Sequence, residues 1–197
     1  ENAMFDHPNV GPGCADQPGY SHLEAIDPLL WVGNEVAAAH AHFGCVVSTV
    51  PSRGLNGRTA PQLTTHAVMF ADGQGKETKA GIVHAKSCIL QGAVYVDAAI
   101  TAGKAVLVHC AWGQNRSCAI CCAFAVLHRG MSAIDAIAYV RERNLIERRY
   151  AGQQPPGGAM HNKAFREIIA EIERERDAAQ PPAMPMAAPQ ATGLSQP

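Results

Sequence analysis

A cysteine, an arginine and a serine at short, fixed spacing are the residues of this chain best suited to chemistry. They belong to the segment HCAWGQNRS, residues 109–117, which directly follows the apolar residues 105–108 and precedes a helix-forming stretch. If a loop at such a strand-to-helix junction curls, its backbone N–H groups point inward and form a nest for an anion. The first turn of the helix adds further unpaired donors and a positive dipole end. The spacing therefore predicts a phosphate-binding loop.

Within this loop the side chains have distinct expected tasks. Gly113 supplies backbone freedom at the bend, and the fork of Arg116 can donate to two oxygens of one phosphate. A thiol among amide dipoles and beside a guanidinium is stabilised as thiolate, so Cys110 is the expected nucleophile. Ser117 can donate its hydroxyl to that sulfur, and His109 is expected to order the loop by hydrogen bonding. The residues expected to contact phosphate are Ala111, Trp112, Gly113, Gln114, Asn115 and Arg116.

The loop resembles the signature of the protein tyrosine phosphatase superfamily, His-Cys-x5-Arg-Ser/Thr, at every defining position. The resemblance extends over about residues 27–172, and its details favour the dual-specificity branch. The matching segments are Asp27-Pro28-Leu29-Leu30-Trp31-Val32-Gly33, Met131-Ser132-x-x-Asp135-Ala136 and Asn162-x-x-Phe165. The resemblance implies a phosphatase that acts through a cysteinyl-phosphate intermediate, without metal or other cofactor, on phosphotyrosine, phosphoserine or phosphothreonine in proteins.

The same family places an aspartic acid upstream of the cysteine, on a loop after a strand, to protonate the leaving oxygen. Asp72 fits this position, 38 residues before the cysteine (110 − 72), in a Gly-rich segment. Glu77 and Asp97 are the competing carboxylates. Because residue 97 falls inside a predicted helix, its side chain is expected on the flank of that helix, and Asp72 is the preferred acid.

The same residues are compatible with other functions. The substrate could be a non-protein phosphate, either an RNA 5′-triphosphate end or a phosphoinositide, and the domain could also be a catalytically silent phosphate-binding module. Sulfur transfer and arsenate reduction use similar loops. The variable loop positions carry no positive charge, which disfavours phosphoinositides, whereas Asn115 before the arginine is similar to RNA-triphosphatase relatives.

The elements that must position the loop alternate between strand and helix. Apolar runs predict strands at residues 29–32, 45–50, 67–70 and 105–108, and the 3.6-residue period predicts helices at about 80–102, 116–128, 133–143 and 162–176. Gly103 and Gly130 are expected to end helices, and Ser132 with Asp135 resembles a capping box. The pattern indicates an α/β fold of the protein tyrosine phosphatase kind. Its central twisted sheet would have about five mostly parallel strands, flanked by helices.

The expected organisation is an N-terminal extension over residues 1–26, a catalytic domain over residues 27–176 and a flexible Ala/Pro-rich tail over residues 177–197. The formal net charge of −1 argues against a nucleic-acid partner, and no apolar run is long enough to predict a membrane span. The seven cysteines lack paired metal spacing, which argues against a zinc site. Because the sequence shows no secretory signal, reduced thiols and a cytoplasmic location are expected. The expected partner is a phosphorylated protein, and the oligomeric state stays open.

Overall fold

A five-stranded sheet in the order β1-β2-β5-β3-β4 organises the structure, a computed structural model in which residues 19–35, 37, 43–51, 63–73, 76–144 and 158–179 are described. The strands are β1 (Tyr20–His22), β2 (Leu30–Gly33), β3 (Cys45–Ser48), β4 (Thr64–Ala67) and β5 (Val106–His109). Among these described strands, the β1–β2 pairing is antiparallel and the β2–β5, β3–β5 and β3–β4 pairings are parallel. The predicted α/β fold with a mostly parallel sheet is confirmed.

Strand β5 occupies the centre of the sheet, as expected for an apolar strand without charge. All four of its residues are buried, because neighbours cover both edges and both faces. Its last residue, His109, is in register with Gly33 of β2 and Ser48 of β3. The chain that follows β5 therefore leaves the sheet between the carboxyl ends of two parallel strands, where open α/β sheets form ligand crevices.

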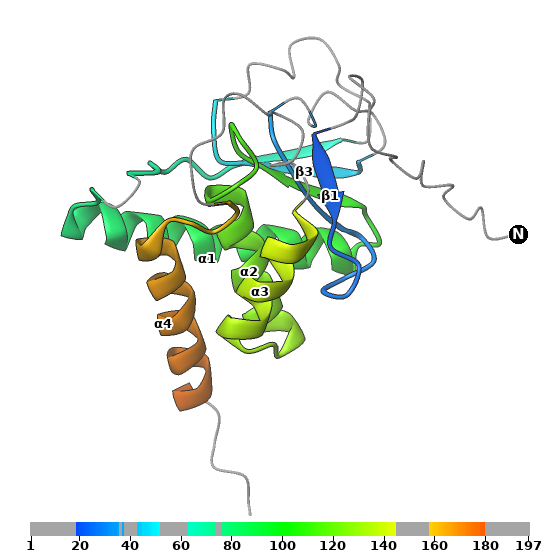
Figure 1. The fold of residues 1–197 in the computed structure, drawn as a ribbon. Coiled ribbons are helices and arrows are strands. Elements are labelled where there is room, and N and C mark those ends of the chain that lie inside the picture. The colour runs from blue at the N-terminus through cyan, green and yellow to red at the C-terminus, as the bar shows by residue number, and fades with distance from the viewer. Residues whose placement is uncertain are drawn as a thin grey trace, which may run out of the picture.

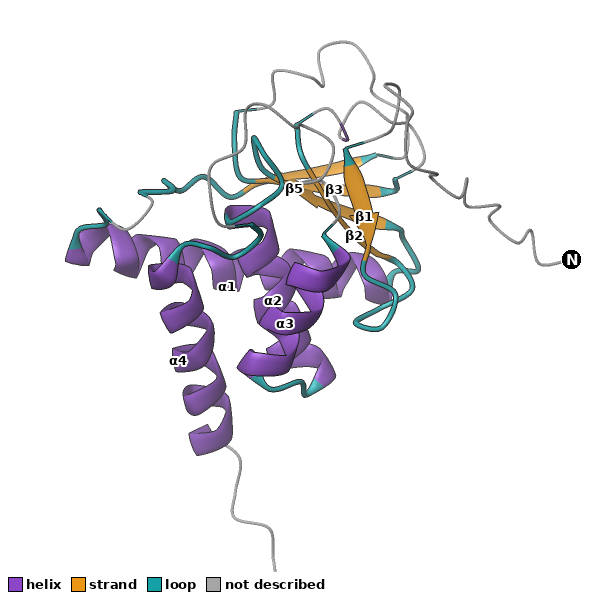
Figure 2. Cartoon of the chain, in the orientation of Figure 1, coloured by secondary structure: helices purple, strands orange, loops and turns teal. Residues whose placement is uncertain are grey.

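Four helices gather on one side of the sheet, as Figures 1 and 2 show. They are α1 (Lys79–Thr101), α2 (Arg116–Arg129), α3 (Ala133–Arg143) and α4 (Lys163–Ala179). Helix α2 packs against the other three helices and against β2 and β5, so its residues 117–126 are all buried. This central helix begins at the end of the 109–117 loop, and its burial anchors one side of that loop.

The helix boundaries follow the local signals in the sequence. Ser132 caps α3 by accepting a hydrogen bond from the Asp135 amide at 3.1 Å. Gly130 ends α2 in the left-handed conformation, with φ of 69°. The predicted apolar stripe of α4, which contains Phe165 and Ile172, is buried. Among the described residues, no helix has both the length and the apolar character needed to cross a membrane.

Two predictions about the edges of the sheet were wrong. Tyr20–His22 forms β1, and Leu23 and Ile26 lie in the core, so the folded unit begins before residue 27. Strand β4 covers residues 64–67 rather than 67–70. Both edge strands are short and partly polar, so an apolar pattern does not detect them. Residues 1–18 and 180–197, which hold most of the two predicted extensions, lie outside the described residues.

Candidate active site

The loop between β5 and α2 curls around the sulfur of Cys110. The backbone N–H of Gly113 donates to Cys110 Sγ at 3.0 Å. Gly113 adopts a φ of 72°, in the left-handed region that a residue with a side chain rarely enters, so a glycine is required at this bend. Within the described residues, no backbone carbonyl accepts from the amides of Ala111, Trp112, Gln114 and Asn115. These amides form the predicted set of donors available to an anion.

The side chain of Ser117 lies on the same sulfur. Its Oγ is 3.3 Å from Cys110 Sγ and donates to it. Cys110 is buried, with 3% of its surface exposed, and Ser117 is fully buried. A hydroxyl and an amide that both point at one sulfur stabilise negative charge there.

The guanidinium of Arg116 is bonded to neighbouring segments through Nη1, whereas its Nε has no partner among the described residues. Its Nη1 donates to the carbonyl oxygens of Thr49 and Phe70, each at 3.3 Å. These contacts join the end of β3 and the segment after β4 to the loop. The Nε of Arg116 is buried and has no hydrogen-bond partner in the part of the chain that the structure describes. A tetrahedral oxyanion in the loop would satisfy this donor together with the loop amides.

His109 supports the loop through its backbone rather than its ring. Its carbonyl accepts from Thr49 N at 3.0 Å and from Thr49 Oγ1 at 3.3 Å. Among the described residues, neither ring nitrogen has a partner that meets hydrogen-bond geometry, so a role of the His109 side chain in ordering the loop stays a prediction. Burial lowers the pKa of His109 to about 4, while the backbone of Cys110 acts in the opposite direction. The ring is therefore neutral at physiological pH.

The structure brings Asp72 to the rim of the loop. Asn115 Nδ2 donates to Asp72 Oδ2 at 3.0 Å, and Asn162 Nδ2 donates to Asp72 Oδ1 at 2.9 Å. Glu77, one competing carboxylate, accepts from the same Asn162 amide. Of these two carboxylates, only Asp72 has a hydrogen bond to a side chain of the loop in the described residues.

Asp97, the other competing carboxylate, lies elsewhere. It forms an ion pair with His128, with 3.2 Å between Oδ1 and Nδ1. Residue 97 is on α1 and residue 128 is in the last turn of α2, at the far end from the loop. The placement of Asp97 on the flank of α1 agrees with the prediction.

Two residues from distant segments support the back of the loop, and sequence reasoning did not identify them. Asn144, which follows α3, donates through Nδ2 to Gly113 O at 2.6 Å and to Cys118 Sγ at 3.1 Å. The amide of Met160 donates to Gln114 O at 2.8 Å. An asparagine at a helix end is so common a cap that it carries no recognisable signal of this role.

The other cysteines of α2 differ from Cys110 in their surroundings. Cys118, Cys121 and Cys122 are completely buried, and burial raises the pKa of each thiol above its usual value. They fill gaps in the core as protonated thiols. Among the described residues, no cluster of three or more His, Cys, Asp or Glu side chains could hold a metal ion.

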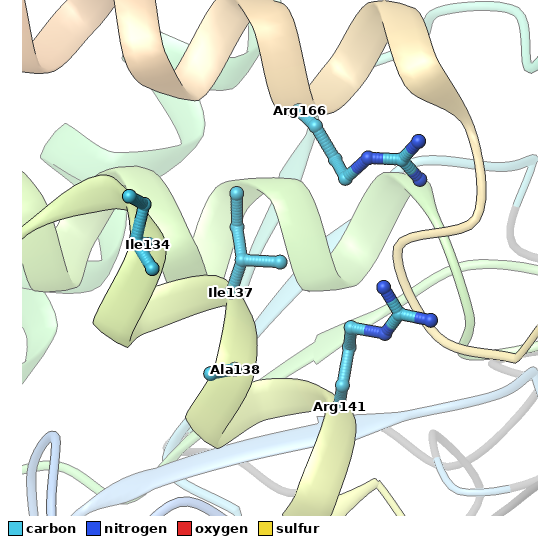
Figure 3. Close-up of a pocket in the computed structure, with 5 residues that line it drawn as sticks. All are labelled: Ile134, Ile137, Ala138, Arg141 and Arg166. Atoms are coloured by element: carbon cyan, nitrogen blue, oxygen red, sulfur yellow. The ribbon is translucent and has the colours of Figure 1, made fainter.

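Trp112 is 45% exposed, so its ring is available at the surface of the loop. A shallow pocket of about 480 Å³ lies between α3 and α4, and none of the loop residues lines it. Figure 3 shows Ile134, Ile137, Ala138 and Arg141 on α3, with Arg166 extending from α4.

Comparison with known proteins agrees with this geometry. A family model described as dual specificity phosphatase, catalytic domain, matches residues 85–153, which include the whole loop. Human dual specificity phosphatase 28 is 29% identical over 141 residues, covering 67% of this chain and 76% of the human protein.

Solved structures share the fold. The crystal structure of human DUSP28 gives a TM-score of 0.56 at 23% identity, covering 82% of this chain and 97% of that chain. A human tyrosine phosphatase-like serine/threonine/tyrosine-interacting protein gives 0.58 at 19% identity, covering 81% and 98%. The fold, the match to the family model over residues 85–153 and the loop geometry agree, and they identify the chain as a cysteine-dependent phosphatase similar to the dual-specificity phosphatases of the protein tyrosine phosphatase superfamily.

Proposed function

We propose that the chain hydrolyses phosphate monoesters on protein side chains, with Cys110 as nucleophile, Arg116 as phosphate clamp and Asp72 as general acid. The observation that carries this proposal is the sulfur of Cys110, which accepts hydrogen bonds from Gly113 N and Ser117 Oγ inside the loop. These contacts favour a charged nucleophile at the point where the loop amides can hold a phosphate.

The reaction has two chemical steps. Cys110 sulfur attacks phosphorus and forms the S–P bond while the P–O bond to the leaving group breaks, and protonated Asp72 gives its proton to the leaving oxygen. Water then attacks the cysteinyl-phosphate and the S–P bond breaks. The carboxylate of Asp72 takes a proton from that water, and Ser117 stabilises the departing thiolate by its hydrogen bond. The products are an alcohol or phenol and inorganic phosphate.

Protein substrates are favoured over more highly charged ones by the character of the loop. Its variable positions, Ala111, Trp112, Gln114 and Asn115, carry no positive charge, and the whole chain has a formal net charge of −1. A phosphoinositide or an RNA 5′-triphosphate brings several negative charges, which cationic side chains would have to neutralise. We place the catalytic domain at residues 20–179, a range that begins at β1 and ends with α4.

The decisive test is hydrolysis of 4-nitrophenyl phosphate in the presence of a metal chelator. The wild-type protein should turn over without metal, and Cys110→Ser should lose activity by more than about 10⁴-fold because the hydroxyl is a far weaker nucleophile. Retained activity in Cys110→Ser would disprove the assignment. A panel of phosphotyrosine, phosphoserine and phosphothreonine peptides, phosphoinositides and RNA 5′-triphosphate ends then identifies the substrate class.

A further inference from the structure

A buried amide lies between the loop and Asp72. Asn115 is 2% exposed, and its Nδ2 donates both to Asp72 Oδ2 at 3.0 Å and to His161 Nε2 at 2.9 Å. Its Oδ1 accepts from the backbone N–H of Asn162 at 3.2 Å. A primary amide has two N–H donors, and both are in use here. Rotation of the amide by 180° would break all three contacts, so its orientation is determined by its neighbours.

The hydrogen bonds of His161 define its tautomer. Its Nδ1 lies 2.8 Å from the carbonyl oxygen of Gly158, which can only accept, so Nδ1 carries the proton. In the neutral ring Nε2 then has a lone pair, and it accepts from Asn115. The ring thus holds one of the two amide hydrogens and leaves the other directed at Asp72.

The segment that carries His161 is pinned to the loop. Met160 has a φ of 54°, a left-handed conformation that is unfavourable for a residue with a side chain. The conformation is held by the bond from Met160 N to Gln114 O at 2.8 Å. Arg166 Nη1 also donates to the carbonyls of Met160 and His161, at 2.7 and 2.8 Å. The position of the imidazole is therefore determined by backbone contacts on both sides of it.

We propose that His161 is a positioning residue for the general acid. It sets the orientation of the Asn115 amide, and this amide holds the carboxyl group of Asp72 at the rim of the phosphate loop before substrate arrives. The inference rests on the proposed role of Asp72. Preorganisation of the acid matters most when the leaving oxygen is strongly basic, as in phosphoserine, and least when the leaving group is an acidic phenol.

The variants His161→Asn and His161→Gln differ in side-chain length by one methylene group. Together they distinguish a role in orienting Asn115 from a general contribution of residue 161 to the stability of the fold. In His161→Asn the amide can still donate to Gly158 O, but it is too short to accept from Asn115. In His161→Gln the side-chain oxygen reaches the place of Nε2. Lys163→Ala is the matched control, because Lys163 lies two residues away and its side chain is 79% exposed. Equal thermal midpoints of the four proteins establish that the variants fold.

The measurement is kcat and KM over a series of phosphate esters whose leaving groups rise in basicity. We expect His161→Asn to lower kcat about fivefold for a phosphoserine peptide and less than about twofold for 4-nitrophenyl phosphate, with KM unchanged. His161→Gln should recover most of the loss, and Lys163→Ala should match the wild type. An equal loss on all substrates, or no loss in His161→Asn, overturns the proposal.

Combination with Asp72→Asn tests whether the effect passes through the acid. The double variant His161→Asn/Asp72→Asn should be no slower than Asp72→Asn alone, since the group to be positioned is gone. Additive losses would contradict the proposed route. If instead the wild-type protein hydrolyses none of the esters, or Cys110→Ser keeps its activity, the proposed function itself fails.

Discussion

The loop around Cys110 and the cluster around Asp72 lie side by side, yet they are assembled over very different distances along the chain. Cys110 is contacted by Gly113 and Ser117, three and seven residues away. Asp72 is contacted by Asn115 and Asn162, 43 and 90 residues away. The surroundings of the proposed nucleophile are thus determined largely by local backbone geometry, and those of the proposed acid by side chains that only the tertiary fold brings together.

This difference indicates how each side responds to mutation. A contiguous loop that holds both the proposed nucleophile and the proposed clamp should affect every substrate, because every phosphate must enter it. A cluster of polar side chains around the proposed acid should affect one proton transfer, so its importance should depend on the leaving group. The predictions below test that contrast.

The largest effect is expected at Arg116. Lysine cannot reproduce the fork of the guanidinium, so Arg116→Lys should lower kcat/KM about a thousandfold for 4-nitrophenyl phosphate and for phosphopeptides alike. Steady-state kinetics on both substrates would check this. A loss of kcat/KM confined to substrates with poor leaving groups would contradict the expectation that the loop around Cys110 affects all substrates alike.

A loss of about a hundredfold in kcat is expected for Asp72→Asn with phosphoserine peptides, because the amide cannot protonate the leaving oxygen. The loss with 4-nitrophenyl phosphate should be much smaller, and inhibition by inorganic phosphate should be unchanged. The decline of the rate at high pH should also disappear. Glu77→Gln is the matched control; if it, rather than Asp72→Asn, produced this pattern, the acid would be the wrong one of the two.

The buried imidazole of His109, at the start of the loop, should make the free energy of unfolding depend on pH. The native pKa of His109, about 4, lies below its ordinary value of 6.5, so the unfolded chain takes up the proton first as the pH falls. The free energy of unfolding should therefore decrease between about pH 6.5 and pH 4, by about 2 kcal/mol between pH 7 and pH 5.

Denaturant unfolding of the wild type and of His109→Asn at both pH values measures this contribution. The variant should lose less stability on acidification than the wild type. Equal losses would place the pH dependence in other groups and would remove His109 from the account of the loop.

The smallest effect is expected at Asn162, which holds Asp72 from the side opposite Asn115. Asn162→Ala should lower kcat about five- to tenfold for phosphoserine peptides and leave KM for 4-nitrophenyl phosphate nearly unchanged, since one hydrogen bond to the carboxyl is lost. Kinetics on both substrates, with Asn162→Asp tested alongside, would measure it. An effect of Asn162→Ala as large as that of Arg116→Lys would mean that the cluster around Asp72 also determines the conformation of the loop around Cys110.

The sequence by itself determined the fold class, the four long helices and the loop that brings together Cys110, Gly113, Arg116 and Ser117. These features depend on periodic apolar residues, helix ends and a short loop at a strand-to-helix junction, all of which are local. The role of Asp72 as general acid stays a prediction, and it depends on a resemblance to a family position rather than on the neighbours of Asp72 in the sequence.

Tertiary structure alone decided the edges of the sheet and the surroundings of Asp72. Strands β1 and β4 lie at the sheet edges and are short and partly polar, so their pairing depends on the strands beside them rather than on their own pattern. Asn144, Met160 and His161 reach the loop from α3 and from the segment before α4. A polar side chain acquires such a role only when packing brings it to a buried partner, because only there does an unpaired polar group carry a large cost.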